Sequence, residues 1–104
     1  MDITSEEDFQ LKVMQSTVPV AIDFWAEWCG PCKMVDPVLT QLSLEYKDKV
    51  LFVKVNIDDL PDIATKYGIQ SIPTLVIVQV GTEKNRIVGA HPKAHYVQEL
   101  NKLV

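Results

Sequence analysis

Apolar and polar residues follow two kinds of pattern along the 104-residue chain, and each kind predicts a different element. Nearly continuous apolar runs, rich in β-branched and aromatic residues, predict strands buried on both faces at 18–26, 50–58 and 73–81. Apolar residues at helical spacing predict helices at 4–16, 32–49, 60–68 and 91–104. A shorter run at 85–90 follows Gly81, and we expect it to form a hairpin with the run at 73–81.

Capping and turn residues support the helix boundaries. Thr4 and Glu7 have the spacing of a capping box for the first helix. Pro61 stands near the first turn of the third helix, and Gly68 marks its end. Pro92 opens the last helix.

The order of the elements predicts an α/β fold. A strand, a helix and a strand at the front of the chain predict a right-handed parallel crossover, and the hairpin adds antiparallel strands. We therefore expect a mixed central β-sheet of about four to five strands with helices on both faces. The sequence contains no linker or repeat, so residues 1–104 are predicted to form a single domain.

Composition narrows the possible functions. Hydrophobic residues make up 47% of the chain and charged residues 23%, and the net charge is −4. The acidic balance argues against nucleic-acid binding, and no apolar run approaches the roughly 18 residues of a membrane span. The acidic start "MDITSEEDF" does not resemble a signal peptide, which favours the cytoplasm. A mature organellar form would have the same appearance.

The two cysteines, Cys29 and Cys32, are separated only by Gly30 and Pro31. Such a pair can be a redox dithiol, half of a metal site or two incidental thiols. A strand precedes the pair and a helix follows it, so Cys29 should lie at a helix N-terminus, where its pKa is lowered. Cys32, one turn further along, is close enough to form a disulfide with Cys29 and is expected to be the more buried thiol.

A zinc site would need the two histidines, His91 and His95, as partners of the cysteines. The 58 residues between Cys32 and His91 (33–90) far exceed the roughly 12–15 residues of a zinc finger. We therefore predict no metal, and we interpret both histidines as solvent-facing residues at a helix start.

Two charged residues interrupt apolar strands. Asp23 lies within "VAIDFWA", where burial should raise its pKa, and we interpret it as a functional buried carboxyl rather than a strand-end residue facing water. Lys54 lies within "LFVKVNI" and would approach Asp23 if the two strands are neighbours. Alternatively, its aliphatic stem lies along the core with the ammonium in water, and the two interpretations are compatible.

Trp28 and Pro73 are the remaining candidates. Trp28 precedes the cysteine pair between residues that are not typical of a core, so we expect it to be partly exposed. Pro73 stands at the start of a strand, a position where a cis peptide bond can occur.

These motifs together resemble the thioredoxin family, and the resemblance runs nearly end to end. It is carried by "DFWAEWCGPCK", "KVNID", "YGIQSIPT", Gly81 and "VGA" at 88–90. The resemblance implies the thioredoxin fold, with the central sheet flanked by four helices. It also implies a thiol–disulfide oxidoreductase that reduces protein disulfides.

The resemblance implies a role for each candidate residue. Cys29 would attack, Cys32 would resolve, and Asp23 would handle the Cys32 proton with help from Lys54. Pro73 would be cis and packed against the cysteines, and the Ile72 backbone would pair with an extended substrate segment. The implied substrate-binding surface consists of Trp28, Gly30, Pro31, Ile57, Ile72, Pro73, Val88, Gly89 and Ala90.

The resemblance also implies the partners. The chain itself would bind no cofactor, because electrons would come from NADPH through a flavin-containing thioredoxin reductase. Its clients would be proteins with disulfides, such as reductases and peroxidases, and we expect a monomer that binds neither nucleic acid nor membrane.

Some residues depart from the family pattern. Ser71 replaces a glycine of some relatives, and "VIVQVGTE" lacks the aromatic residue and the Lys-Asn or Lys-Asp pair of many. Asp36 adds a negative charge four residues after Cys32, where we expect it to oppose thiolate formation slightly.

Two other functions are weighed against a disulfide reductant. A binding subunit of the same fold would have no need for the cysteine pair together with Asp23 and Lys54. An oxidase or isomerase of an oxidising compartment is disfavoured by Gly30-Pro31, which stiffens the loop and supplies no charge.

Overall fold

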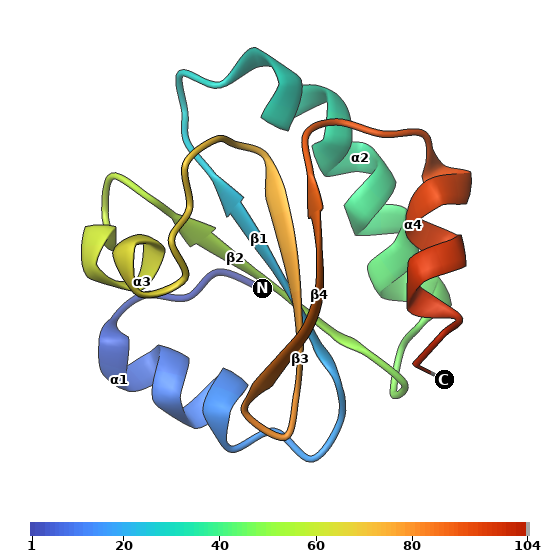
Figure 1. Ribbon diagram of the computed structural model, residues 1–104, viewed down its shortest axis with the longest axis horizontal. Coiled ribbons are helices and arrows are strands. Elements are labelled where there is room, and N and C mark those ends of the chain that lie inside the picture. Colours follow the sequence, from blue (N-terminus) through green and yellow to red (C-terminus); the bar gives the residue numbers. More distant parts are fainter. Residues whose placement is uncertain (104) are drawn as a thin grey trace.

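A computed structural model describes residues 1–103, and its centre is a four-stranded mixed sheet (Figure 1). The strands stand in the order β2-β1-β3-β4. Their bounds are β1 Val20–Trp25, β2 Leu51–Asn56, β3 Thr74–Gln79 and β4 Thr82–Val88. β1 and β2 are parallel, whereas β3 is antiparallel to both β1 and β4. The α/β class, the mixed sheet and the hairpin are thereby confirmed.

Helices cover both faces of the sheet (Figure 1). One face carries α1 (Glu6–Phe9), its continuation as the π-helix η1 (Gln10–Met14), and α3 (Pro61–Lys66). The other face carries α2 (Gly30–Glu45) and α4 (Lys93–Leu100). Pro61 opens α3 as predicted, and Gly68 follows it with φ +61. Residue 104, which the sequence placed in the last helix, lies outside the described residues.

Alternation along β1 divides its side chains between two cores. Ile22 and Phe24 belong to the cluster under α1, η1 and α3. Ala21 belongs to the cluster under α2 and α4. Because successive side chains point to opposite faces, Asp23 lies on the same face as Ala21 and therefore under α2.

The N-terminal cap of the first helix differs from the predicted one. The cap is Ser5, whose Oγ accepts a hydrogen bond from the backbone N–H of Asp8 at 3.0 Å. The Asp8 carboxylate accepts a hydrogen bond from the backbone N–H of Thr4 at 2.9 Å. The predicted pair of Thr4 and Glu7 was therefore wrong by one residue, because serine, threonine and acidic residues follow one another there and spacing alone does not choose among them.

Two strands also differ from their predicted form. β2 is an edge strand in which only Val53 and Val55 are buried, so it is not buried on both faces. β4 begins at Thr82 rather than at residue 85. Its first three residues are polar and exposed, and two of them, Thr82 and Glu83, pair with β3 through the backbone, which leaves no apolar signal in the sequence.

One end of the sheet gathers four segments that are far apart in the sequence. β1 and β2 end there, β3 starts there, and β4 ends there, since Thr74 pairs with both Phe24 and Val88. The first turn of α2 lies above the same end (Figure 1). The cysteine pair is thus surrounded by loops from the whole length of the chain.

Candidate active site

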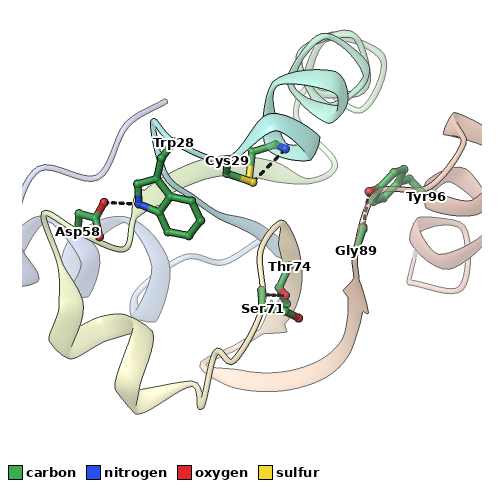
Figure 2. Close-up of a disulfide and its surroundings, with 8 residues drawn as sticks. Trp28, Cys29, Asp58, Ser71, Thr74, Gly89 and Tyr96 are labelled. Carbon is green, nitrogen blue, oxygen red and sulfur yellow. Dashed lines mark hydrogen bonds between the residues drawn. A yellow bond between two sulfur atoms is a disulfide. The ribbon is translucent and has the colours of Figure 1, made fainter.

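The two cysteines form a disulfide at the start of α2 (Figure 2). Cys29 is the N-cap residue, and its Sγ accepts a hydrogen bond from the backbone N–H of Cys32 at 3.1 Å. Their Cα atoms are 5.3 Å apart. The position of Cys29 at a helix N-terminus is as predicted, and Pro31 occupies the first turn, where a missing N–H costs nothing.

The expected difference in burial between the two cysteines was wrong. Cys29 is 4% exposed and Cys32 5% exposed. The reason is the packing around them, because both sulfur-bearing side chains belong to one small cluster with Ala26, against which Ile57 and Ile72 pack. Burial therefore does not distinguish the two cysteines while they are joined in the disulfide.

Trp28 is exposed beside the disulfide (Figure 2). Its side chain is 68% exposed, and its indole Nε1 donates a hydrogen bond to Asp58 Oδ2 at 2.9 Å. The predicted exposure is confirmed. The role of Asp58 as its acceptor was not predicted, because a contact across 30 residues leaves no periodic signal.

Two loops complete the surface around the cysteines. The Ile72–Pro73 peptide bond is cis, as expected. The Pro73 carbonyl accepts a hydrogen bond from the backbone N–H of Gly89 at 2.8 Å, which ties the loop before β3 to the loop after β4. The Gly89 carbonyl in turn accepts a hydrogen bond from the Tyr96 hydroxyl at 3.3 Å (Figure 2).

The structure brings the expected contact residues to this end of the molecule, with different exposures. Five are exposed, namely Trp28, Gly30, Pro31, Val88 and Ala90. Three are partly buried, namely Ile57, Ile72 and Gly89, and Pro73 is buried. A pocket of about 240 Å³ lies among them, lined by Trp28, Ile57, Ile69, Gln70, Ser71 and Ile72. Ile69 and Gln70 were not predicted as part of the surface.

Asp23 is buried beneath α2, with an exposed fraction of 6%. Burial raises the pKa of Asp23 to about 7, while Lys54 lowers it and Asp36 raises it further. Asp23 and Cys32 line the same pocket of about 260 Å³, which is large enough to hold water. The predicted burial and the direction of the pKa shift are confirmed.

Lys54 lies opposite Asp23 in the parallel pairing of β1 and β2, so the two strands are neighbours as supposed. Its ammonium nevertheless forms its ion pair with Asp36, at 2.9 Å from Oδ1. It also lies over the ring of Trp25, 4.4 Å from the centroid. The pairing of Lys54 with Asp36 was not predicted. The sequence contained one signal for the position of Asp36. It follows Cys32 by four residues, and residues four apart on a helix share a face, so Asp36 lies on the same side of α2 as Cys32.

Comparison with known proteins identifies the family. A family model described as "Thioredoxin" matches residues 1–102. The chain belongs to the thioredoxin family. It is 46% identical to "Thioredoxin M-type, chloroplastic" of Chlamydomonas reinhardtii over 98 residues, and this alignment covers 94% of this chain and 70% of that protein. It is 44% identical over 100 residues to "Thioredoxin" of Pyropia yezoensis, an alignment that covers 96% of this chain and 94% of that protein. It is 46% identical over 98 residues to "Thioredoxin 1" of Synechococcus elongatus, covering 94% and 92%.

Membership of the thioredoxin family gives the activity. The chain is a thiol–disulfide oxidoreductase of the protein-disulfide reductase type, and the Cys29–Cys32 pair is its redox-active disulfide. The geometry agrees with this activity, because the pair lies at a helix N-terminus and beneath an apolar surface.

The histidines of this thioredoxin-family chain are partly buried rather than solvent-facing. His91 Nε2 is 2.7 Å from the Val88 carbonyl oxygen, and its ring stacks on that of His95 with 4.5 Å between centroids. Within residues 1–103, no three side chains of the metal-binding types are grouped to hold an ion. In the same part of the chain, no helix has both the length and the apolar character to cross a membrane.

Proposed function

We propose that Cys29 is the attacking nucleophile and Cys32 the resolving thiol. In the reduced protein the free N–H groups at the start of α2 would stabilise a thiolate on Cys29, including the N–H of Cys32 that now points at its Sγ. This thiolate attacks one sulfur of a client disulfide. A mixed disulfide forms, and the other client sulfur leaves as a thiolate that takes up a proton.

Asp23 is proposed as the proton acceptor of the resolving step. With a pKa of about 7, its carboxyl group is present in both forms near neutral pH. The carboxylate takes the Cys32 proton through the shared pocket. The Cys32 thiolate then attacks Cys29 Sγ, the Cys29–Cys32 disulfide forms, and the second client thiolate leaves. The client gains two electrons, which the cysteine pair loses.

The client is proposed to bind on the apolar surface around the disulfide. Trp28 offers a large exposed ring, held by its hydrogen bond to Asp58. Ile57 and Ile72 line the adjoining pocket, and the exposed Val88 and Ala90 extend the surface on the other side. An extended client segment would pair with the backbone of Ile72.

The partners follow from the same proposal. The chain binds no cofactor and receives electrons from NADPH through a flavin-containing thioredoxin reductase. Its clients are disulfide-containing proteins such as reductases and peroxidases, and it acts as a monomer. We place it in the cytoplasm, with an organelle interior as the alternative, since relatives of similar identity include chloroplastic proteins. Fractionation of the source cells decides between the two.

One observation carries the proposal, namely a disulfide at the start of a helix that shares a pocket with a buried carboxyl group. Two variants test the cysteine roles with insulin as the client and NADPH with a reductase as the electron source. Cys29→Ser should abolish reduction. Cys32→Ser should accumulate a mixed disulfide between Cys29 and the client.

Either of two results would contradict the cysteine roles. One is residual reduction by Cys29→Ser above the rate of a Cys29→Ser/Cys32→Ser double variant. The other is a Cys32→Ser protein that yields no trapped client although the same client is reduced by the wild type.

A further inference from the structure

The ammonium group of Lys54 pairs with Asp36, although the position of Lys54 in β2 would also allow it to pair with Asp23. In the parallel register, Lys54 stands directly opposite Asp23. Its Nζ is nevertheless 2.9 Å from Asp36 Oδ1, on α2, and rests over the ring of Trp25. The positive charge is thus paired with the more exposed of the two neighbouring carboxyl groups.

Asp36 lines the same two pockets as Asp23 but is the more exposed of the two residues. It lines the pocket of about 260 Å³ that contains Asp23 and Cys32, and also a smaller one of about 50 Å³ next to Asp23. The Asp36 side chain is 46% exposed and that of Lys54 31%, compared with 6% for Asp23. The ion pair therefore stands between the buried carboxyl group and water.

A pair this exposed contributes little to folding stability, because water and salt screen it. Its geometry has a clearer consequence for the charge beside Asp23. We propose that Asp36 is a positioning residue: by holding the Lys54 ammonium at the mouth of the pocket, it prevents that charge from pairing with Asp23. The inference rests on the proposed role of Asp23 as proton acceptor.

Two effects of Asp36 act on Asp23 in the same direction. The negative charge of Asp36 raises the pKa of Asp23 directly. Asp36 also binds the Lys54 ammonium, which would lower the pKa of Asp23 further if Lys54 turned toward Asp23. A carboxyl group that keeps a pKa near 7 binds the Cys32 proton at neutral pH, whereas one paired with an ammonium would be a weaker base.

Other charged or titratable groups lie around Asp23 on several of the elements packed against it, so they must stay constant in any test. Besides Lys54 and Asp36, the residues with such groups that line the two pockets are Met1, Glu27 and Lys33. Cys32 lines one of them but does not titrate while it is in the disulfide. From α4, the Tyr96 hydroxyl is close enough that Asp23 raises its pKa. The β3 residue opposite Asp23 is the apolar Leu75.

The test is the titration of the Asp23 side-chain carboxyl carbon by NMR in the oxidised protein. Asp36→Asn should lower the midpoint by about one pH unit, because the freed ammonium moves within reach of Asp23. Asp36→Glu keeps the charge and should leave the midpoint within a few tenths of a unit of the wild type. Lys54→Met should raise it.

A double-mutant cycle separates positioning from the direct effect of the Asp36 charge. In a Lys54→Met background, Asp36→Asn should lower the midpoint by clearly less than it does in the wild type, since no ammonium remains to be released. Equal shifts in the two backgrounds would overturn the proposal, and so would an unchanged or raised midpoint in Asp36→Asn.

The chemical consequence is measured separately, in single turnovers that follow release of client from the mixed disulfide. In Asp36→Asn, the pH at which this step reaches half its maximal rate should move to lower pH together with the Asp23 midpoint. If Asp23→Asn does not slow this step, the proposed role of Asp23 fails whatever the NMR titration shows. If Asp23→Asn slows it but Asp36→Asn does not shift the profile, only the positioning role fails.

Discussion

Replacing Asp23 with asparagine should stabilise the oxidised protein, and the gain should depend on pH. The substitution keeps the shape of the side chain and removes its ability to ionise. Asp23 is 6% exposed, and burial raises its pKa from 3.8 to about 7. The folded protein therefore holds a proton that the unfolded chain has already lost throughout the range between these two values.

The sign and the size of the effect follow from this difference. Between pH 3.8 and about 7 the folded state binds more protons at Asp23, so stability falls as pH rises. The two pKa values differ by about three units, and each unit corresponds to about 1.4 kcal/mol. Above pH 7, ionisation of Asp23 therefore lowers the free energy of unfolding by about 4 kcal/mol. Below pH 3.8 the carboxyl group is protonated in both states and contributes no pH dependence.

The assay is urea denaturation of the oxidised wild type and Asp23→Asn at pH 3, 5 and 8. The free energy of unfolding of the variant relative to the wild type should rise by about 4 kcal/mol from pH 3 to pH 8. Asp48→Asn serves as a matched control, because Asp48 is exposed and its φ of 70° suits asparagine. A difference between Asp23→Asn and wild type that is the same at pH 3 and pH 8 would refute the reasoning.

Three further substitutions test the surface, the core and a turn. Trp28→Ala should raise KM for a protein client about tenfold or more while leaving the urea midpoint nearly unchanged, whereas Leu44→Ala, also exposed, should change neither. Leu42→Ala should lower the free energy of unfolding by about 2–5 kcal/mol, because Leu42 is fully buried; a loss of less than about 1 kcal/mol would contradict its place in the core. Gly68→Ala should cost about 1–2 kcal/mol at φ +61, and Gly68→Asn less; equal costs would argue against the left-handed conformation.

Most of the fold could be predicted from apolar periodicity and a few turn residues. The apolar runs at β1 and β3 are long and uninterrupted except at Asp23, and Pro61 and Gly68 bound α3 as predicted. The prediction failed where backbone pairing replaces side-chain burial. The first residues of β4 are polar, and the strand is defined by its hydrogen bonds to β3.

The candidate site could be predicted as far as single residues and their elements. Cys29 at the start of α2 and Asp23 within β1 follow from their neighbours in the sequence. The choice that Lys54 makes between Asp23 and Asp36 does not, because it depends on how α2 crosses the sheet and on which side-chain conformer the lysine adopts.

Contacts between distant loops were also beyond the sequence pattern. The equal burial of Cys29 and Cys32 results from Ile57 and Ile72, which reach the cysteines from two other loops. The hydrogen bond from Trp28 to Asp58 likewise joins residues that no local rule relates.

The central claim, that the Cys29–Cys32 pair is a disulfide reductant, is tested most directly by its reduction potential. Equilibration with a glutathione or dithiothreitol buffer, followed by alkylation and mass measurement, gives this value. We expect a strongly reducing potential near the about −270 mV of thioredoxins, a family value that is not calculated from the geometry. A potential near the about −120 mV of strong dithiol oxidants would contradict the account and favour an oxidase.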